Sequence, residues 1–274
     1  MIEINDLGFS YGSKSVLDHI SIKFEDGKIY GLLGENGVGK TTLLTLLAGL
    51  KNAGSGSICT DGDNPFNRRP SLLNNQYYLP DEVQAPNIPA IRYAKMYGAF
   101  WSNFDITKFQ TILEEFEVDG SAKMNTMSTG QLKKTHIALA LSLGVKYLFL
   151  DEPTNGLDIP SKSQFRKALL KYTSDDSVVV ISTHQVRDLE SIIDPIIILD
   201  NNDVLLNCSI AEITKKLYFD YGNTVKPGSL YSEQLPGGFV QVFVNETGED
   251  SKVNVEALFN AVHGNKELIK KLYE

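Results

Sequence analysis

The sequence contains few cysteines, and the two that are present lie far apart. Cys59 and Cys208 are the full complement of a 274-residue chain, and they form no CxxC pair. Two isolated cysteines indicate neither a disulfide framework nor a cysteine-based metal site. The simplest interpretation is a reducing compartment, so we expect a cytoplasmic protein.

Basic side chains and long apolar runs are also scarce. Lys and Arg total 26 against 34 Asp and Glu, a formal charge of −8, which argues against a surface devoted to nucleic acid, and we expect no nucleic-acid partner. The longest apolar stretches, Leu43–Leu50 and Ile137–Val145, fall well short of the roughly 18 to 20 residues that cross a bilayer. The first residues, Met1–Asp6, show no basic segment followed by an apolar one, so we expect neither a secretory signal nor a membrane span.

The remaining composition is that of an ordinary globular protein, with 42% apolar and 22% charged residues. A length of 274 residues exceeds one simple domain and falls short of two, so we expect one large domain with an appendage. After about residue 210, Pro-Gly turns, an apolar run at Phe239–Val244 and a helical face from Val255 predict a small α+β appendage over residues 211–274.

The order of apolar patterns predicts an α/β architecture for the large domain. Residues 1–30 alternate apolar and polar side chains, as short antiparallel strands do. Residues 82–126 carry apolar and aromatic side chains at three- and four-residue spacing, which predicts amphipathic helices. Continuous apolar runs separated by helical segments indicate a parallel sheet covered on both faces; these runs are Val145–Leu150, Val178–Ile181 and Ile196–Leu199.

An apolar run at Ile29–Leu33 ends in a glycine-rich loop that precedes a predicted helix at Thr41–Leu50. The loop and Thr41 match the pattern G-x-x-x-x-G-K-[ST]. Glycines allow several backbone N–H groups to face one anion, and a helix N-terminus adds a favourable dipole. Lys40 then places an ammonium group against the β- and γ-phosphates of a nucleotide, and the Thr41 hydroxyl can ligate Mg²⁺. Chance would produce this pattern in about one such chain in a hundred.

Acidic residues follow the predicted strand at Leu148–Leu150. Because the carboxyl ends of parallel strands share one edge of a sheet, Asp151 can reach the Mg²⁺ shell and Glu152 can orient or deprotonate an attacking water. His184 follows the Val178–Ile181 run at the same edge and can contact the γ-phosphate. A lone histidine is more often structural than functional, so both interpretations of His184 stay open at this point.

In order and spacing, these segments resemble the nucleotide-binding domain of the ABC ATPase superfamily. The glycine-rich loop resembles its Walker A motif, Met127–Gln131 its signature sequence L-S-G-G-Q, and Leu148–Thr154 its Walker B strand with the catalytic glutamate. Asn155–Asp158 is similar to the D-loop, and His184 to the switch histidine. The resemblance covers residues 1–210, and a signature sequence at this spacing before Walker B is specific to the superfamily.

The resemblance implies an α/β fold of the P-loop NTPase type, the ABC cassette. A RecA-like parallel sheet forms its core, with an N-terminal antiparallel β-subdomain and an α-helical signature subdomain at about residues 82–140. The cassette is expected to span residues 1–210, and the α+β appendage residues 211–274. Two such cassettes are expected to pair head to tail, with ATP between the Walker A motif of one and the signature of the other.

The family's site residues carry over to matching positions of this sequence. Glu152 and His184 are the expected catalytic residues. Thr41, Asp81 and Asp151 are the expected Mg²⁺ ligands, and Tyr11 matches the aromatic residue that stacks on adenine. The residues expected to bind ATP are Tyr11, Gly34, Glu35, Asn36, Gly37, Val38, Gly39, Lys40, Thr41, Thr42, Ser128, Gly130 and Gln131.

Three positions depart from the family's pattern. Met127 stands where leucine is usual, which is a mild change between apolar side chains of similar volume. Thr129 replaces a signature glycine, and its Cβ would slow hydrolysis or alter the phosphate geometry if this position requires a positive φ. Asp81 stands at the position of the Q-loop glutamine; a carboxylate also ligates Mg²⁺, but it is shorter and charged.

A single cassette without a membrane span implies, in this superfamily, a separate membrane permease. We expect an ATP-binding and ATP-hydrolysing subunit at the cytoplasmic face of the membrane, acting as a homodimer or heterodimer. The segment that follows Asp81, which includes Pro86 and Pro89 and the aromatic-rich helices to Phe104, is the expected contact with the permease. Residues 194–200 and the following hairpin resemble exporter-type ATPases of the ABC-2 kind, so export is expected. The alternative is a soluble ABC ATPase that serves as an assembly or regulatory module without a permease.

Overall fold

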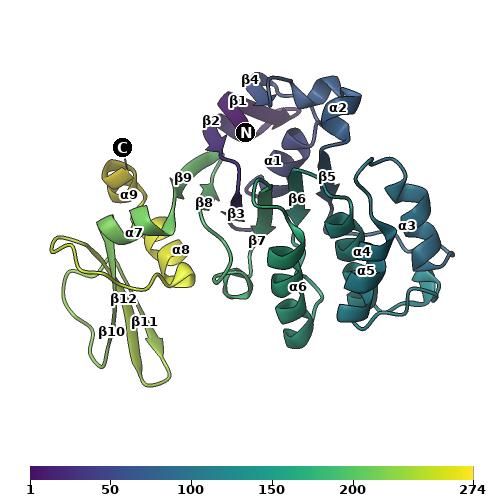
Figure 1. The fold of residues 1–274 in the computed structure, drawn as a ribbon. Coiled ribbons are helices and arrows are strands. Elements are labelled where there is room, and N and C mark those ends of the chain that lie inside the picture. The colour runs from purple at the N-terminus through teal and green to yellow at the C-terminus, as the bar shows by residue number, and fades with distance from the viewer. Residues whose placement is uncertain (274) are drawn as a thin grey trace.

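A six-stranded sheet forms the centre of the large domain in the computed structural model, which describes residues 1–273 (Figure 1). The last residue of the predicted appendage, 274, lies outside the described residues. All neighbouring strands are parallel except β9, which returns antiparallel beside β8 as a hairpin. The strands in spatial order are β5 (Gln76–Leu79), β6 (Tyr147–Asp151), β7 (Val178–Thr183), β3 (Lys28–Leu33), β8 (Ile196–Asp200) and β9 (Asp203–Cys208).

The continuous apolar runs of the sequence correspond to strands that are buried on both faces. Successive side chains of a strand point to opposite faces, and in β6 Phe149 joins one apolar cluster while Leu150 joins another. The first cluster includes helix α1 (Lys40–Leu47), and the second includes helices α5 (Thr129–Ser142) and α6 (Ile159–Tyr172). Helices therefore cover the sheet on both sides, as predicted for an α/β fold.

Helix α1 ends earlier than the sequence pattern predicts. The predicted helix runs to Leu50, whereas α1 stops at Leu47. The N–H of Gly49 donates to the carbonyl of Leu46, and the N–H of Leu50 to that of Thr45, which is the geometry of a Schellman cap. Gly49 has φ of 66°, and a Cβ there would lie 2.1 Å from a carbonyl oxygen of Pro65, so glycine is required at this turn.

An antiparallel three-stranded sheet lies beside α1, as expected for the N-terminal β-subdomain (Figure 1). It places Tyr11, the last residue of its first strand, near the glycine-rich loop. Two short helices then lead to β5. The elements are β2 (Lys14–Phe24), β1 (Ile2–Tyr11) and β4 (Ser55–Thr60), followed by η1 (Pro65–Asn67) and α2 (Pro70–Leu73).

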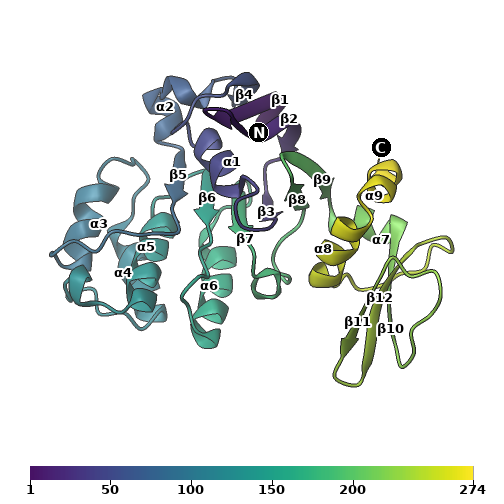
Figure 2. The ribbon, with the colours of Figure 1, turned by 180° about the vertical axis from the view of Figure 1, so that it is seen from behind.

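The predicted amphipathic helices form a helical subdomain at one end of the molecule (Figures 1 and 2). Phe109, Ile112 and Leu113 of α4 are buried on one face of that helix, as their spacing predicts. Ser128 caps α5, where its side chain and that of Gln131 form a capping box. The elements before α5 are α3 (Ala90–Gly98), α4 (Ile106–Glu115) and η2 (Met124–Thr126).

The C-terminal segment forms an α+β unit at the other end of the molecule (Figure 2). Its antiparallel sheet has the strand order β10-β12-β11. The apolar residues of this unit belong to the same buried cluster as β8 and α6, so its core is continuous with that of the large domain. Its elements are α7 (Ile210–Lys216), β10 (Leu217–Gly222), β11 (Tyr231–Leu235), β12 (Gly238–Val244), α8 (Val255–Gly264) and α9 (Lys266–Tyr273).

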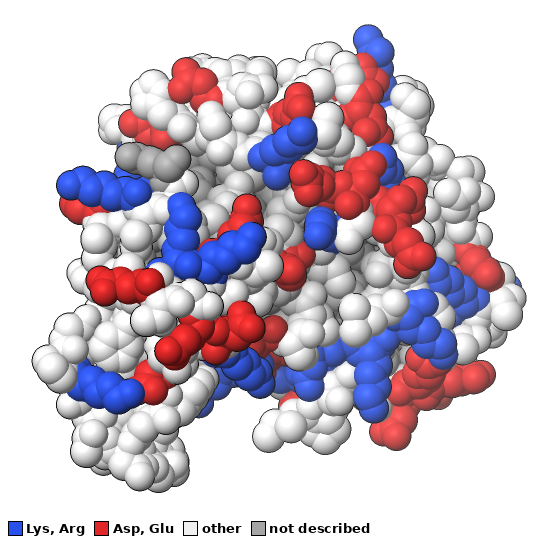
Figure 3. Space-filling view, turned by 60° about the vertical axis from the view of Figure 1, so that its left-hand side comes forward, with Lys and Arg blue, Asp and Glu red and all other residues white. Residues whose placement is uncertain are grey.

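The surface carries both signs of charge. Figure 3 shows acidic and basic side chains on the face that it presents, and several basic side chains adjoin one another in the lower half of the view. None of the helices in residues 1–273 has both the length and the apolar character needed to span a membrane.

The packing of α6 against the sheet gives a stability prediction. Phe165 is fully buried on this helix, so Phe165→Ala should remove its buried contacts, leave a cavity and lower the free energy of unfolding by about 3–5 kcal/mol. Leu170, on the same helix, is 58% exposed, and Leu170→Ala should change that free energy by less than about 0.5 kcal/mol. Urea unfolding of the two variants measures both effects, and similar losses would contradict the assignment of the buried face.

Candidate functional site

The glycine-rich loop wraps around the side chain of Lys40, the first residue of α1. Gly37 and Gly39 adopt φ of 87° and 112°, a region that glycine enters without a steric cost. The Lys40 ammonium donates to the carbonyl oxygens of Gly34 (2.7 Å) and Glu35 (3.1 Å), so the loop holds it in place. Burial lowers the pKa of Lys40, and the carboxylates of Glu152 and Asp151 oppose that shift.

The carboxylate of Asp151 connects three elements at the end of β6. Its Oδ2 accepts hydrogen bonds from the hydroxyls of Thr41 (2.7 Å) and Tyr78 (3.2 Å), and its Oδ1 accepts one from Ser182 (2.5 Å). These partners come from α1, β5 and β7, and Asp151 is almost fully buried. Burial raises the pKa of Tyr78, which keeps the phenol protonated as a donor. Neither Tyr78 nor Ser182 was predicted as a site residue. Each can be recognised as a partner of Asp151 only when the neighbours and the register of β6 are known.

The oxygen donors beside the glycine-rich loop fit Mg²⁺. This hard cation prefers hydroxyl, carboxylate, water and phosphate oxygens, and Thr41, Asp151 and Asp81 all line one cavity. Within residues 1–273, no three His, Cys, Asp or Glu side chains converge on a point where they would bind a metal by themselves.

Glu152 lies between Lys40 and His184. Its Oε1 is 3.7 Å from the Lys40 ammonium nitrogen and 2.9 Å from Nδ1 of His184, and its Oε2 accepts from the backbone N–H of His184 (3.3 Å). Its backbone has φ of 45°, which is unusual for a residue with a side chain. Two hydrogen bonds from its own N–H to Ser182 hold this conformation. A carboxylate fixed in this way can accept a proton from a water at the cavity.

Asp81 contacts a buried cation that the sequence analysis missed. The Lys133 ammonium lies 3.2 Å from a carboxylate oxygen of Asp81 and donates to its backbone carbonyl (2.7 Å), and its side chain is 3% exposed. Asn155 also donates to both carboxylate oxygens, at 3.3 Å each. Burial lowers the pKa of Lys133, and Asp81 opposes that shift. The charge that distinguishes Asp81 from a glutamine is thus offset by Lys133.

One cavity of about 360 Å³ brings together most of the residues predicted for the nucleotide site. Tyr11 lies at its edge, 49% exposed, with its hydroxyl 3.4 Å from that of Thr42 and the Lys51 ammonium 4.8 Å from its ring centre. Lys14, which was not predicted, adds a further cation to the lining. The predicted residues that line this cavity are Tyr11, Asn36, Gly37, Gly39, Lys40, Thr41, Thr42, Asp81, Asp151 and Glu152.

Other predicted residues lie outside that cavity. Gly34, Glu35 and His184 line a separate hollow, described below. Val38 packs against the apolar cluster that includes α1, and a Cβ on Gly34 would lie 2.7 Å from its side chain. The signature residues Ser128, Gly130 and Gln131 do not line either space in a single chain.

The signature segment presents a helix N-terminus to solvent. Ser128 is exposed and caps α5, and Gln131 is engaged with it: the backbone N–H of Ser128 donates to the Gln131 carboxamide oxygen (3.1 Å), and the backbone N–H of Gln131 to the Ser128 hydroxyl (3.3 Å). Thr129 is the first residue of the helix and is absent from the positive-φ residues of the described chain. The condition under which Thr129 would strain the backbone is therefore not met.

The Asp81–Lys133 pair gives a prediction for stability. Asp81→Asn leaves the Lys133 ammonium buried without its counter-charge, and we expect a loss of about 1–3 kcal/mol in the free energy of unfolding. Adding Lys133→Met removes the buried charge and should restore most of that loss. Urea unfolding of the parent, the single and the double variant measures this, and a single variant as stable as the parent would rule out the proposed charge compensation.

The model of the family described as ABC transporter matches residues 17–155. The ABC transporter ATP-binding protein YtrB of Bacillus subtilis is 27% identical over 97% of this chain and 99% of its own length. The bacitracin transport ATP-binding protein BcrA of Bacillus licheniformis is 29% identical over 79% of this chain and 72% of its own length.

Solved structures show the same fold. The structure of an ATP-binding subunit of an ABC transporter superposes with a TM-score of 0.72 at 22% identity, covering 78% of this chain and 91% of that one. A dimeric structure of a bacterial ABC transporter cassette gives a TM-score of 0.68 at 19% identity, covering 77% and 99%. From the match over residues 17–155 and these superpositions, we conclude that the chain belongs to the ABC transporter family and has the fold of its ATP-binding cassettes.

Proposed function

We propose that this chain is the ATP-binding and ATP-hydrolysing subunit of an ABC transporter. One observation carries the proposal: Lys40, Thr41, Asp151 and Glu152, predicted separately from the sequence, line a single cavity at the mouth of the glycine-rich loop. ABC cassettes bind ATP and hydrolyse it to ADP and phosphate. The contacts described here suit that reaction, because a cation, oxygen ligands for a metal and a carboxylate base lie within one small volume.

Each residue has a distinct task in the proposed reaction. The loop N–H groups and Lys40 bind the phosphates, and Thr41, Asp151 and Asp81 would hold Mg²⁺, which neutralises phosphate charge when bound. Glu152 orients the attacking water and accepts its proton. His184 keeps the Glu152 carboxylate turned toward the cavity through the 2.9 Å contact and positions it beside the γ-phosphate.

The exposed signature segment supports a composite site. The N–H groups at the start of α5 face solvent in one chain, although a helix N-terminus is well suited to bind an anion. In the proposed complex, two chains associate head to tail, and Ser128 and Gly130 of one bind the γ-phosphate held by the other. Loss of that phosphate bond would separate the chains and drive motion in a partner.

An apolar groove supports a separate membrane permease as that partner. It has a volume of about 520 Å³ between α2, β5 and the end of α3, with Leu50, Tyr77, Phe100 and Trp101 in its lining. Phe100 is 78% exposed and Leu50 51%. An apolar face of this kind fits an amphipathic helix, and we assign it to a cytoplasmic helix of the permease. Most of its lining residues precede the predicted segment between Asp81 and Phe104, with which it shares Phe100 and Trp101.

The relatives support transport across a membrane, and we propose that the chain lies at the cytoplasmic face of that membrane. Proteins similar to this chain are named for bacitracin transport and for lantibiotic transport, and we propose export as the direction. A soluble ABC ATPase that acts as an assembly or regulatory module is the alternative. Recovery of the chain with membranes, together with a hydrophobic partner, favours the transporter, whereas a purely soluble complex favours the alternative.

Removing the proposed base should trap the dimer. Glu152→Gln cannot accept the proton of the attacking water, so phosphate release should fall by about 10²–10⁴-fold relative to the parent. ATP then persists between two chains, and gel filtration in saturating Mg-ATP should show a dimer. Lys40→Ala in the same background should remain monomeric because it loses a phosphate contact. A Glu152→Gln chain that stays monomeric in saturating ATP would count against the composite site.

Disrupting the apolar groove should release the chain from its membrane partner. Phe100→Asp places a charge on the exposed apolar face, and the fraction of the chain that sediments with membranes should fall at least about fivefold. Leu268→Asp, at a 39% exposed position on α9, is the matched control and should leave that fraction unchanged. Equal membrane recovery of both variants would refute this groove as the docking site.

A further inference from the structure

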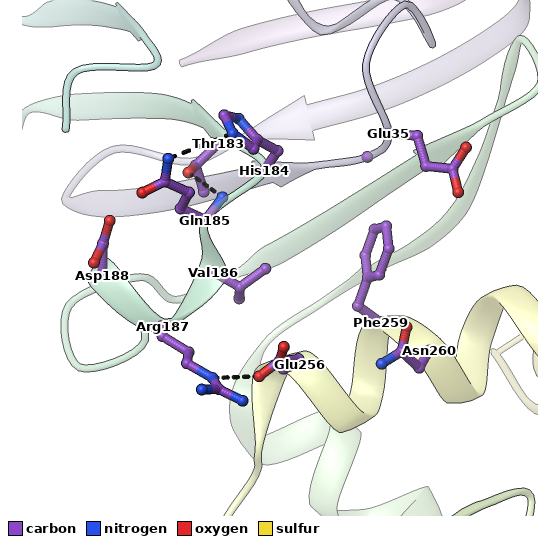
Figure 4. A pocket seen from close by; sticks show the side chains of 11 residues that line it. Glu35, Thr183, His184, Gln185, Val186, Arg187, Asp188, Glu256, Phe259 and Asn260 are labelled. Atoms are coloured by element: carbon purple, nitrogen blue, oxygen red, sulfur yellow. Dashed lines mark hydrogen bonds and ion pairs between the residues drawn. The ribbon is translucent and has the colours of Figure 1, made fainter. Parts of the chain in front are cut away.

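A hollow of about 530 Å³ lies between the glycine-rich loop, the segment after His184 and helix α8 (Figure 4). It is larger than the cavity that holds the proposed nucleotide residues. The apolar side chains of Val186 and Phe259 project into it, and Glu35 borders it from the loop. The hollow is therefore lined by residues of both the glycine-rich loop and the C-terminal unit.

The C-terminal wall of this hollow is firmly attached to the large domain. Arg187 forms an ion pair with Glu256 of α8 beside the hollow. Behind it, Leu189 and Leu258 are both fully buried in the continuous apolar cluster. Lys266 at the start of α9 pairs with Asp200 of β8. Because α8 is held at several points, Phe259 and Asn260 are fixed parts of the lining.

The chain also carries an apolar side chain that has no cover. Ile159 is the first residue of α6 and follows the segment Asn155–Asp158 that resembles the D-loop. It is 84% exposed, the highest exposure among the large apolar side chains of residues 1–273. An isoleucine held outward at the rigid start of a helix is poorly suited to solvent and well suited to an apolar hollow on another molecule.

The hollow and Ile159 lie close together on one side of the chain. Lys162, one turn further along α6, donates to the side chain of Gln185 (2.9 Å) and pairs with Asp188 (2.6 Å). Gln185 and Asp188 both line the hollow. A two-fold axis that passes between the hollow and Ile159 places the Ile159 of each copy opposite the hollow of the other copy, as in an isologous dimer.

We propose that the hollow receives Ile159 of a second copy of this chain, so that α8 of the C-terminal unit forms part of the dimer interface. Ile159 of each copy would contact Val186 and Phe259 of the other. The exposed carboxylate of Asp158 would approach the guanidinium of Arg187, which is 71% exposed. This inference rests on the ATP-dependent dimer of the proposed function and extends it by assigning the C-terminal unit a role in that dimer.

Cross-linking between two differently tagged chains tests the contact. Both chains carry Glu152→Gln, with Cys59→Ser and Cys208→Ser to remove the natural thiols. One chain adds Ile159→Cys and the other Asn260→Cys, and the mixture is treated with a short bismaleimide in Mg-ATP. A cross-linked species containing both tags is expected, at least tenfold more abundant with ATP than without it. Leu170→Cys, at the far end of α6, replaces Ile159→Cys in the control and should yield no such species.

A second measurement uses variants without cysteine chemistry. In the Glu152→Gln background, Ile159→Asp should raise the dimer dissociation constant at least tenfold by sedimentation, whereas Leu170→Asp should change it less than twofold. Two results would overturn the proposed contact alone while the ATP-dependent dimer still forms. One is cross-linking no greater than in the Leu170→Cys control, and the other is an unchanged dissociation constant in the Ile159→Asp variant. Absence of any ATP-dependent dimer in the Glu152→Gln chain overturns the proposed function together with this contact.

Discussion

The carboxylate of Asp151 is the interaction on which the geometry of the site depends. It is buried at the end of β6 and accepts hydrogen bonds from the first turn of α1, from β5 and from β7. A buried carboxylate without donors would be costly, so the three strands and the helix are constrained to positions that satisfy it. The same constraint places Glu152, the next residue, beside the glycine-rich loop. Site and fold are thus specified by one set of contacts.

The C-terminal unit is built onto this arrangement and is not an independent addition. Its helix α8 packs against the segment that follows His184, and its apolar residues continue the cluster beneath β8 and α6. Residues that hold the proposed base and residues of the C-terminal unit are therefore separated by a single short segment, η3 (Val186–Asp188). Movement of this segment would change the contacts of α8, which connects the unit directly to the site.

Sequence patterns predicted the parts of the fold that depend on local information. The apolar runs of β6 and β7 indicated strands buried on both faces, as the structure confirms. The predicted last turn of α1 was wrong, because the chain leaves the helix at Gly49, whose φ is 66° and whose neighbour Pro65 leaves no room for a side chain. The strands β10 and β11 were not predicted. The residues of β11 are mostly polar and half-exposed, whereas Leu217 and Phe219 of β10 are buried at alternate positions, a signal that the sequence analysis missed.

Most of the predicted site residues lie close together within one chain, apart from those of the signature segment. Their roles stay predictions. The sequence did not reveal contacts between residues that lie far apart along the chain. Lys133 lies 52 residues from its partner Asp81, and Ser182 lies 31 residues from its partner Asp151. Neither has a local motif that marks it. The hollow beside α8 also needed the structure, because it joins the loop at residue 34 to residues near 260.

The most direct test of the composite site is the rate of phosphate release per chain, measured in Mg-ATP over a range of chain concentrations. We predict that this rate rises with concentration as chains associate and that Ser128→Arg suppresses it, because each catalytic site then lacks the signature of a partner. A rate per chain that stays constant while light scattering shows monomers throughout would contradict it.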